Sequence, residues 1–286
     1  MASSLLGYLR DDLNGALRAG AALTPSDPPG GSTWLALWAG SCLVAGLTLL
    51  LACGYEAGFA RVNGWASTHP AWVWQWLTVL GDERVPFALS LFLARHRPRI
   101  FWALILAALV ATAYSRGLKP LFDMPRPLAV LGPDQLNLIG PALRRSSFPS
   151  GHSVTAGVFF GVLVYYARRP EIRALWMAVA LLAGLSRVAI GVHWPVDVAF
   201  GLLGGVAAAW VGARLAARWS SLAVDGGVHL AFVTLACFFT LTLTYWDGGY
   251  TLARPLLTTL GWAALSYTAL VYALKPLAAG LTGTRA

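Results

Sequence analysis

The sequence predicts an all-α integral membrane protein, a polytopic helix bundle with about eight spans. Of its 286 residues, 57% are hydrophobic and 12% are charged, whereas soluble domains usually carry about 25% charged residues. The chain also contains a series of apolar segments close to the roughly 20 residues that a helix needs to cross a bilayer. Tryptophans and basic residues lie near the ends of these segments, which is typical of residues at a membrane surface.

The predicted spans occupy most of the chain. They are residues 33–54, 72–94, 100–117, 152–168, 173–190, 195–214, 228–245 and 255–274. The second span is interrupted by the polar run 81–84, so its continuous hydrophobic part is expected to begin at Val85. The tryptophan-rich stretch before that run is then expected to lie along the membrane interface.

The first 32 residues are expected to form a separate N-terminal segment, cytoplasmic or interfacial, and residues 33–286 the transmembrane domain. Leucines recur at every fourth position from Leu5 to Leu17, beside charged residues. Such a stripe is typical of an amphipathic helix that lies on the membrane surface. A frayed terminal tail is the alternative. A turn-rich stretch with several prolines and glycines then leads into the first span.

Charge and cysteine content narrow the possible partners. The net charge is +9, but the basic residues are scattered at the ends of apolar segments and form no basic run with interleaved aromatics. Nucleic acid is therefore not expected as a partner, and the lipid bilayer is. Cys42, Cys53 and Cys237 lie in apolar stretches without the paired spacing of a metal site, so they are interpreted as packing residues. The sequence makes no prediction for the oligomeric state.

The distribution of basic residues predicts an orientation. The short connections 95–99, 168–173 and 214–218 are rich in arginine and alternate so that they share one side of the membrane. The positive-inside rule assigns that side to the cytoplasm, and eight spans then keep both termini inside. The expected location is the bacterial inner (cell) membrane, with the opposite face toward the periplasm or the outside.

Three short clusters of polar residues lie at the ends of spans on that opposite face. They are Lys119-x6-Arg126-Pro127, Pro149-Ser150-Gly151-His152 and Ser186-Arg187-x5-His193-x3-Asp197. Enzymes that transfer phosphoryl groups act mainly by positioning and by stabilising charge. Lys119, Arg126 and Arg187 could supply that charge, and the planar guanidinium groups match phosphate oxygens. The alternative for each cation is snorkelling toward the membrane interface.

The second and third clusters add a helix start and two histidines. Ser150 is a favourable N-cap, and the free amide groups at a helix start attract anions. His193 and Asp197 lie four positions apart, around a proline that suits the first turn of a helix. A carboxylate bonded to one ring nitrogen fixes the histidine tautomer and leaves the other nitrogen as a nucleophile. The alternatives are an ordinary cap, an interfacial histidine, and an aspartate that only complements the helix dipole.

In this order and spacing the clusters resemble the tripartite signature of the type 2 phosphatidic acid phosphatase (PAP2) superfamily, over residues 119–197. The resemblance implies a PAP2-like six-helix core, to which the last two spans, within 228–274, are additions without an assigned function. It implies that His193, oriented by Asp197, attacks phosphorus to form a phosphohistidine, and that His152 protonates the leaving oxygen. It also implies a phosphate site made by Lys119, Arg126, Ser150, Gly151 and Arg187. Members of the family require no metal or other cofactor.

The resemblance further implies hydrolysis of a membrane lipid phosphate or diphosphate, of the undecaprenyl diphosphate or phosphatidylglycerol phosphate type. The loop between the first two clusters is expected to cap the site, with Arg144 and Arg145 contacting a second phosphate or a head group. Attraction to anionic lipids is the alternative for these two arginines. A lipid phosphotransferase would share the same intermediate. A non-enzymatic lipid transporter is disfavoured because the charges lie at span ends instead of the midplane, and a haloperoxidase because such relatives are soluble.

Overall fold

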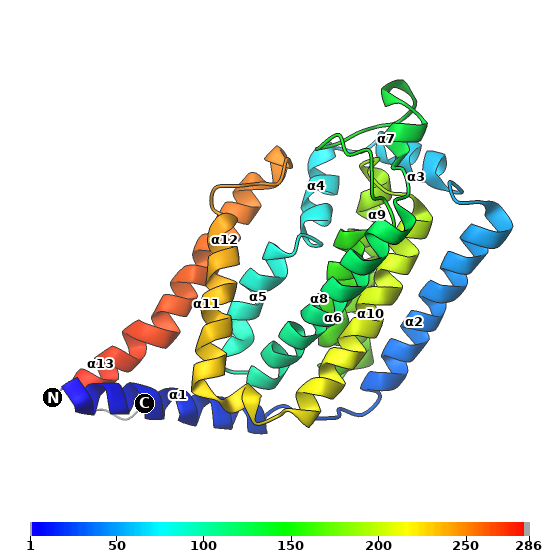
Figure 1. Ribbon diagram of the computed structural model, residues 1–286. Coiled ribbons are helices and arrows are strands. Elements are labelled where there is room, and N and C mark those ends of the chain that lie inside the picture. Colours follow the sequence, from blue (N-terminus) through cyan, green and yellow to red (C-terminus); the bar gives the residue numbers. More distant parts are fainter. Residues whose placement is uncertain (1, 283–286) are drawn as a thin grey trace.

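The computed structural model describes residues 2–282, and all regular elements in that range are helices (Figure 1). The predicted all-α bundle is therefore confirmed. Five helical stretches are long and apolar enough to cross a membrane, namely Gly31–Cys53, Pro98–Val130, Pro170–Ala189, Pro195–Arg218 and Thr251–Leu281. Shorter apolar helices span Arg84–Ala94, Gly151–Tyr166 and Gly226–Thr242. Together these stretches correspond to the predicted spans, and the chain is an integral membrane protein.

The helices follow the chain in a simple order. The first group is α1 (Ala2–Ala22), α2 (Gly31–Thr48) with its continuation η1 (Leu49–Cys53), α3 (Phe59–Ala66), α4 (Ala71–Val79), α5 (Arg84–Ala94) and α6 (Pro98–Phe122). Two short elements, α7 (Pro127–Val130) and η2 (Pro133–Gln135), precede α8 (Gly151–Tyr166), α9 (Pro170–Ala189) and α10 (Pro195–Arg218). The last group is η3 (Leu222–Val224), α11 (Gly226–Thr242), η4 (Thr251–Ala253), α12 (Arg254–Ala269), η5 (Leu270–Leu274) and α13 (Lys275–Thr282).

Helices α6, α8 and α10 form the tightly packed centre of the bundle. Glycines allow close approach between α8 and α10: a Cβ atom on Gly157 would lie 2.9 Å from the carbonyl oxygen of Leu202. Gly212 performs the same role between α10 and α6, where a Cβ atom would lie 2.5 Å from the amide nitrogen of Ala107. Small residues at such crossings bring helix backbones together. The starts of α8 and α10 are thereby fixed side by side.

The second predicted span is broken as expected. Helix α4 ends at Val79 and α5 begins at Arg84, so the interruption coincides with the polar run 81–84. Gly81 packs against the start of α8, since a Cβ atom there would lie 2.6 Å from the carbonyl oxygen of His152. Helix α4 packs against α9, and Trp74 on it is buried. The stretch before the break therefore packs on the bundle, and its location at the membrane interface stays a prediction.

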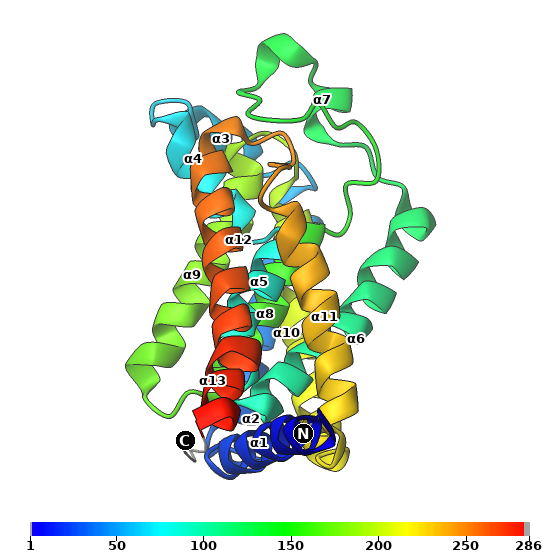
Figure 2. The ribbon, with the colours of Figure 1, turned by 90° about the vertical axis from the view of Figure 1, so that its left-hand side faces the viewer.

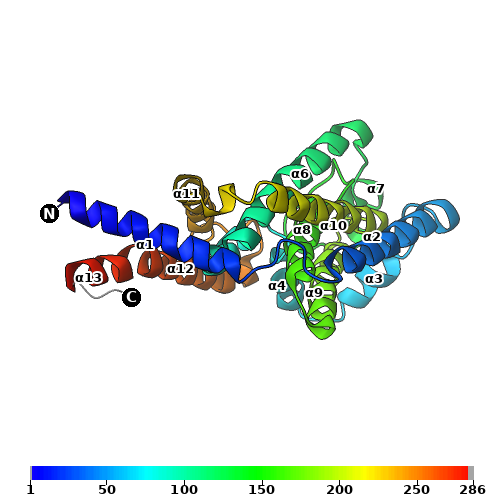
Figure 3. The ribbon, with the colours of Figure 1, turned by 90° about the horizontal axis from the view of Figure 1, so that it is seen from below.

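Helix α1 lies across one end of the bundle, roughly perpendicular to the other helices (Figures 1 and 3). Leu13 and Leu17 are buried, and Asp12 forms an ion pair with Arg95 at 2.5 Å. The leucine stripe thus forms a helix, as predicted, and it packs on the bundle instead of fraying. The arginine-rich connections lie at this same end. The opposite end, called the distal end below, contains α3, α4 and α7.

Candidate active site

The residues of all three sequence clusters lie on helix ends at the distal end of the bundle. They are Lys119 in the last turn of α6, Arg126 just before α7, Ser150, Gly151 and His152 at the start of α8, Arg187 in the last turn of α9, and His193 and Asp197 at the start of α10. Close packing of α6, α8, α9 and α10 holds these ends together. The distal end therefore gathers residues that are up to 78 positions apart between Lys119 and Asp197.

His193 and Asp197 form a buried pair. Nδ1 of His193 lies 3.2 Å from Oδ2 of Asp197, and the two side chains are 2% and 0% exposed. Pro195 is the first residue of α10, as predicted, and the amide of Trp194 donates to Asp197 Oδ2 at 2.9 Å. Because an ionised carboxylate only accepts hydrogen bonds, we assign the imidazole proton to Nδ1. Nε2 then carries the lone pair.

Two hydroxyl groups that were not predicted from the sequence complete the surroundings of Asp197. Ser147 donates to Oδ2 and Tyr55 donates to Oδ1, both at 2.5 Å. Burial first, and then the charge of Asp197, raise the pKa of Tyr55 above its ordinary value, so this phenol remains a donor. The location of Ser147 next to the second cluster was a weak indication in the sequence that it belongs to the site. The sequence contained no signal for Tyr55, which follows the first span.

Replacing Tyr55 with phenylalanine is expected to lower kcat/KM about tenfold, since a hydrogen bond to a charged group contributes roughly 1.5–3 kcal/mol. The loss should fall mainly on kcat, because the bond orients His193 through Asp197 and does not reach the substrate. Steady-state kinetics with the substrate would measure it. Tyr114→Phe is the matched control, because its hydroxyl bonds to the carbonyl of Phe200 inside the bundle. Equal effects of the two substitutions would contradict the positioning role.

Arg126 contacts the other ring nitrogen of His193, Nε2. Its Nη1 is 3.1 Å from Nε2 of His193 and also donates to the carbonyl oxygen of Val192 at 3.1 Å. Its Nε donates to the carbonyl oxygen of Arg145 at 2.8 Å. Burial first, and then the positive charges of Arg126, Arg187 and Lys119, lower the pKa of His193 well below its usual value. The imidazole is therefore neutral at neutral pH, which is its nucleophilic form.

Arg187 approaches the same region from α9. It is 2% exposed, and its Nη1 donates to Thr78 Oγ1 and to the hydroxyl oxygen of Tyr250, both at 2.7 Å. Its Nε is buried and has no hydrogen-bond partner among residues 2–282, and the same is true of Nε2 of His152. Buried polar nitrogens are rarely left unpaired. An anion between these groups would satisfy them.

Lys119 and the helix start of α8 border the same space. Nζ of Lys119 donates to the carbonyl oxygen of Ser146 at 3.3 Å, and Nη2 of Arg126 donates to the same oxygen at 3.4 Å. Ser150 is the N-cap of α8, as predicted, and its Oγ accepts from the amide of Ser153 at 3.3 Å. A Cβ atom on Gly151 would meet nothing within 4 Å. The helix start is thus open to a ligand.

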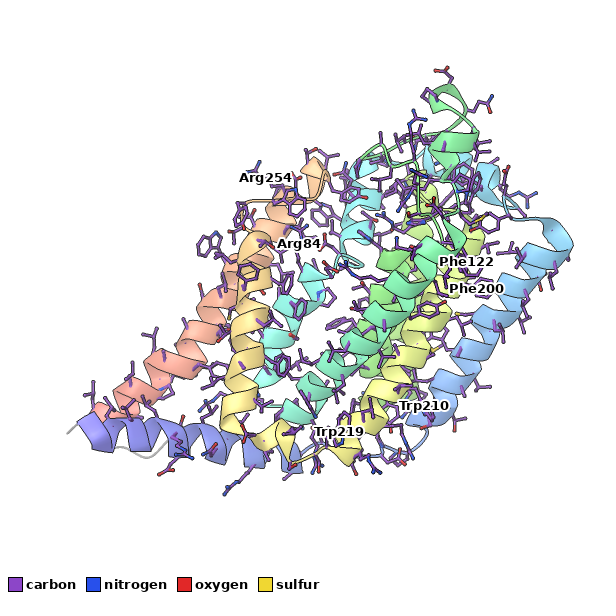
Figure 4. The ribbon with its side chains drawn as sticks, in the orientation of Figure 1. Arg84, Phe122, Phe200, Trp210, Trp219 and Arg254 are labelled. Carbon is purple, nitrogen blue, oxygen red and sulfur yellow. The ribbon has the colours of Figure 1, made fainter. Side chains whose placement is uncertain are left out.

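Aromatic rings anchor the segment that carries the second cluster. The ring of Phe148 lies 5.1 Å from that of Phe122 and 5.5 Å from that of Phe200, both edge to face. Figure 4 shows Phe122 and Phe200 near each other, at the end of α6 and on α10. Edge-to-face pairs at this spacing are favourable. The three rings connect the loop before α8 to the helices beneath it.

Arg144 and Arg145 lie outside the buried cluster. Both side chains are exposed; Arg144 Nη1 donates to the carbonyl oxygen of Leu128 at 3.3 Å, and Arg145 Nη2 lies 3.2 Å from Asp123 Oδ2. The carbonyl oxygen of Arg144 accepts a hydrogen bond from the backbone amide of Arg126, and the carbonyl oxygen of Arg145 accepts one from Nε of Arg126. Both residues thus hold Arg126 through their backbone. A contact of their side chains with a head group stays a prediction.

The fold and this site define the class of the protein: a helical membrane protein with a buried histidine–aspartate pair surrounded by cations. The PAP2 superfamily profile matches residues 86–221, which include all three clusters. The chain belongs to the PAP2 superfamily.

Curated relatives match parts of the chain. Identity is 44% over 59 residues with the lipid A 1-phosphatase of Rhizobium etli, covering 21% of this chain and 25% of that protein. It is 34% over 117 residues with the bacitracin transport permease protein BcrC of Bacillus licheniformis, covering 40% and 54%. It is 28% over 126 residues with the undecaprenyl-diphosphatase of Sulfolobus acidocaldarius, covering 42% and 57%. The matches thus span between a quarter and just over half of these relatives.

Among solved structures, the crystal structure of Aquifex aeolicus LpxE is similar to this chain. The sequence identity is 34% and the TM-score is 0.49, with 54% of this chain and 91% of that chain covered.

Proposed function

We propose that the protein is a membrane phosphatase that hydrolyses a lipid phosphate or diphosphate through a phosphohistidine at His193. The observation that carries this proposal is the 3.1 Å contact between Nε2 of His193 and Nη1 of Arg126, with Nδ1 of the same ring bound to Asp197. A neutral, oriented nitrogen beside a fixed cation is what attack on phosphorus requires. Membership in a superfamily whose relatives include named lipid phosphatases supports the same activity.

In the first step, Nε2 of His193 forms a bond to phosphorus while the bond from phosphorus to the lipid oxygen breaks. His152, in its protonated form, gives its proton to that oxygen, and the dephosphorylated lipid leaves. Arg126, Arg187 and Lys119 hold the phosphoryl oxygens, on which negative charge accumulates. Asp197 stabilises the positive charge that develops on the His193 ring.

In the second step, water attacks the phosphorus of the phosphohistidine. His152, now neutral, takes a proton from the water, the nitrogen–phosphorus bond breaks, and inorganic phosphate leaves with His193 restored. Ser150 and Gly151 bind the phosphate at the start of α8, where free amide groups favour an anion. The charge that the reaction needs comes from lysine and arginine, so we propose that catalysis is independent of metal ions.

The substrate is proposed to be a lipid of the undecaprenyl diphosphate or phosphatidylglycerol phosphate type, presented at the extracytoplasmic face of a bacterial inner membrane. The arginine-rich connections at the α1 end support this orientation through the positive-inside rule. Residues 1–32 would then lie at the cytoplasmic surface and residues 33–286 would form the phosphatase domain. Arg144 and Arg145, exposed at the rim, are within the region where a head group or a second phosphate would lie.

The purified protein in detergent is expected to release inorganic phosphate from at least one member of a panel of lipid phosphates and diphosphates, and excess chelator should leave the rate unchanged. The panel should contain undecaprenyl diphosphate, phosphatidylglycerol phosphate, phosphatidate and lipid A. Phosphate release is measured colorimetrically, with His193→Ala protein as the background. Rates equal to that background on every lipid would contradict the proposal.

The same assay separates hydrolysis from phosphotransfer. With a lipid diphosphate carrying labelled terminal phosphate and an added acceptor lipid, hydrolysis gives labelled free phosphate. Label on the acceptor lipid would instead identify a phosphotransferase with the same intermediate.

A further inference from the structure

The connection between α11 and α12, residues 243–253, lies at the distal end, beside α4 (Figures 1 and 2). It falls outside residues 86–221, the part of the chain that the superfamily matches. No function was predicted from the sequence for the two spans that it joins. Its contacts, however, reach the candidate active site.

Two sets of hydrogen bonds fix this connection to α4 and α5. Arg84 Nη1 donates to the carbonyl oxygen of Trp246 at 2.8 Å, and its guanidinium lies 4.8 Å from the centre of the Trp246 ring. The amide of Leu252 donates to Gln75 Oε1 at 2.8 Å, and Trp76 Nε1 donates to the carbonyl oxygen of Leu252 at 3.1 Å. Figure 4 shows Arg84 between the α11–α12 hairpin and α4. The connection is therefore held at both ends.

Tyr250 projects from this connection into the site. It is 3% exposed, and its ring packs on Gly140, where a Cβ atom would lie 2.5 Å from the ring. Gly140 has a φ of +92°, so glycine is favoured there by its backbone as well as by space. The hydroxyl oxygen of Tyr250 accepts a hydrogen bond from Arg187 Nη1 at 2.7 Å. Thr78 on α4 accepts from the same nitrogen.

These contacts occupy one edge of the Arg187 guanidinium and leave the other edge available to a ligand. Nη1 of Arg187 is occupied by Tyr250 and Thr78, whereas Nε and Nη2 have no partner within residues 2–282. Nε and one terminal nitrogen form the planar fork that binds two phosphate oxygens. An arginine side chain is otherwise flexible, and holding it before the ligand binds reduces the entropy that binding must remove.

We propose that Tyr250 is a positioning residue for the proposed phosphatase reaction. Tyr250 holds Arg187 so that the Nε–Nη2 edge of the guanidinium faces the phosphoryl group. The α11–α12 hairpin thereby contributes a residue to the active site. Thr78 supports the same guanidinium from α4. This inference rests on the proposed function for the identity of the ligand. The residues that it adds lie outside the segment that the superfamily matches.

Tyr250→Phe tests the proposal because it removes the hydroxyl and keeps the ring that packs on Gly140. We expect kcat/KM to fall about tenfold, the size expected for a lost hydrogen bond to a charged group. The dissociation constant of inorganic phosphate, measured from its stabilisation of the protein against thermal unfolding in detergent, should rise by a similar factor. Tyr245→Phe is the matched control, since that side chain lies on the same connection and is 63% exposed.

The decisive measurement is the coupling to Arg187. In an Arg187→Ala background, adding Tyr250→Phe should leave phosphate binding and kcat/KM unchanged, because the hydroxyl acts only through that guanidinium. Thr78→Val should show the same dependence on Arg187. A full tenfold further loss in the Arg187→Ala background, or Tyr250→Phe values within twofold of the Tyr245→Phe control, would overturn the proposal. An inactive wild-type protein that still showed this coupling in phosphate binding would instead count against the proposed function alone.

Discussion

The rate of phosphate release is expected to be lower in His193→Ala protein than in the wild type by about 10⁴-fold or more. Losses of this size are seen when the nucleophile is removed from a group of catalytic residues that act together. Nε2 of His193 is the nitrogen that contacts Arg126, and its ring is neutral and fixed by Asp197. Alanine leaves Arg126 and Arg187 able to bind phosphate, so substrate binding should weaken far less than turnover. Initial rates on the best lipid of the panel would measure the loss.

The proposed covalent intermediate gives this prediction a second readout. Wild-type protein quenched during turnover of a lipid with labelled phosphate should carry acid-labile, base-stable label, and His193→Ala protein should carry none. His96→Ala is the matched control, because His96 is exposed at the α1 end of the bundle, in the connection between α5 and α6. A rate for His193→Ala within tenfold of the wild type would remove the phosphohistidine from the mechanism.

The loss of activity in His152→Ala protein is expected to be larger for substrates with a poorer leaving group. General acid catalysis contributes about 10²–10⁴-fold, and it matters most when an alkoxide must leave. His152 is the second residue of α8, and its Nε2 is buried without a hydrogen-bond partner among residues 2–282. This location suits a group that meets the leaving oxygen.

Two substrates distinguish that role from simple structural damage. A lipid monophosphate, with an alcohol leaving group, should show the full loss in His152→Ala protein. An aryl phosphate such as p-nitrophenyl phosphate, whose leaving group needs no proton, should lose less than about tenfold. Equal losses on both substrates would contradict the assignment of His152 as the acid. Phosphate-induced thermal stabilisation checks that the variant still folds and binds phosphate.

Several features of the fold could be predicted because they depend on local sequence. Eight apolar stretches and the charged break at 81–84 correspond to the observed helices and to the gap between α4 and α5. Ser150 and Pro195 each mark the start of a helix. A membrane span can be recognised from the length of its own apolar segment, and a helix cap from the residues next to it. The packing of α4 against α9 could not be predicted in this way.

The partners of the site residues could not be predicted in this way. Tyr55 bonds to Asp197 across 142 positions, Thr78 to Arg187 across 109, and Tyr250 to Arg187 across 63. A tyrosine or threonine near a span end has many possible roles, and its own neighbours in sequence do not distinguish them. Only the packing of α2 and η1 on α10, of α4 on α9, and of the 243–253 connection on α4 brings these hydroxyls to their partners.

The sequence by itself determined that the chain lies in a membrane, which apolar segments form its spans, and which charged residues accompany His193 in the superfamily signature. Those properties follow from composition and spacing within single segments. The tertiary structure alone decided which nitrogen of His193 faces Arg126, which hydroxyls hold Asp197 and Arg187, and that the C-terminal hairpin reaches the site. Hydrogen bonds of that kind depend on how distant helices are placed relative to one another, and glycine-mediated packing within the bundle sets that placement.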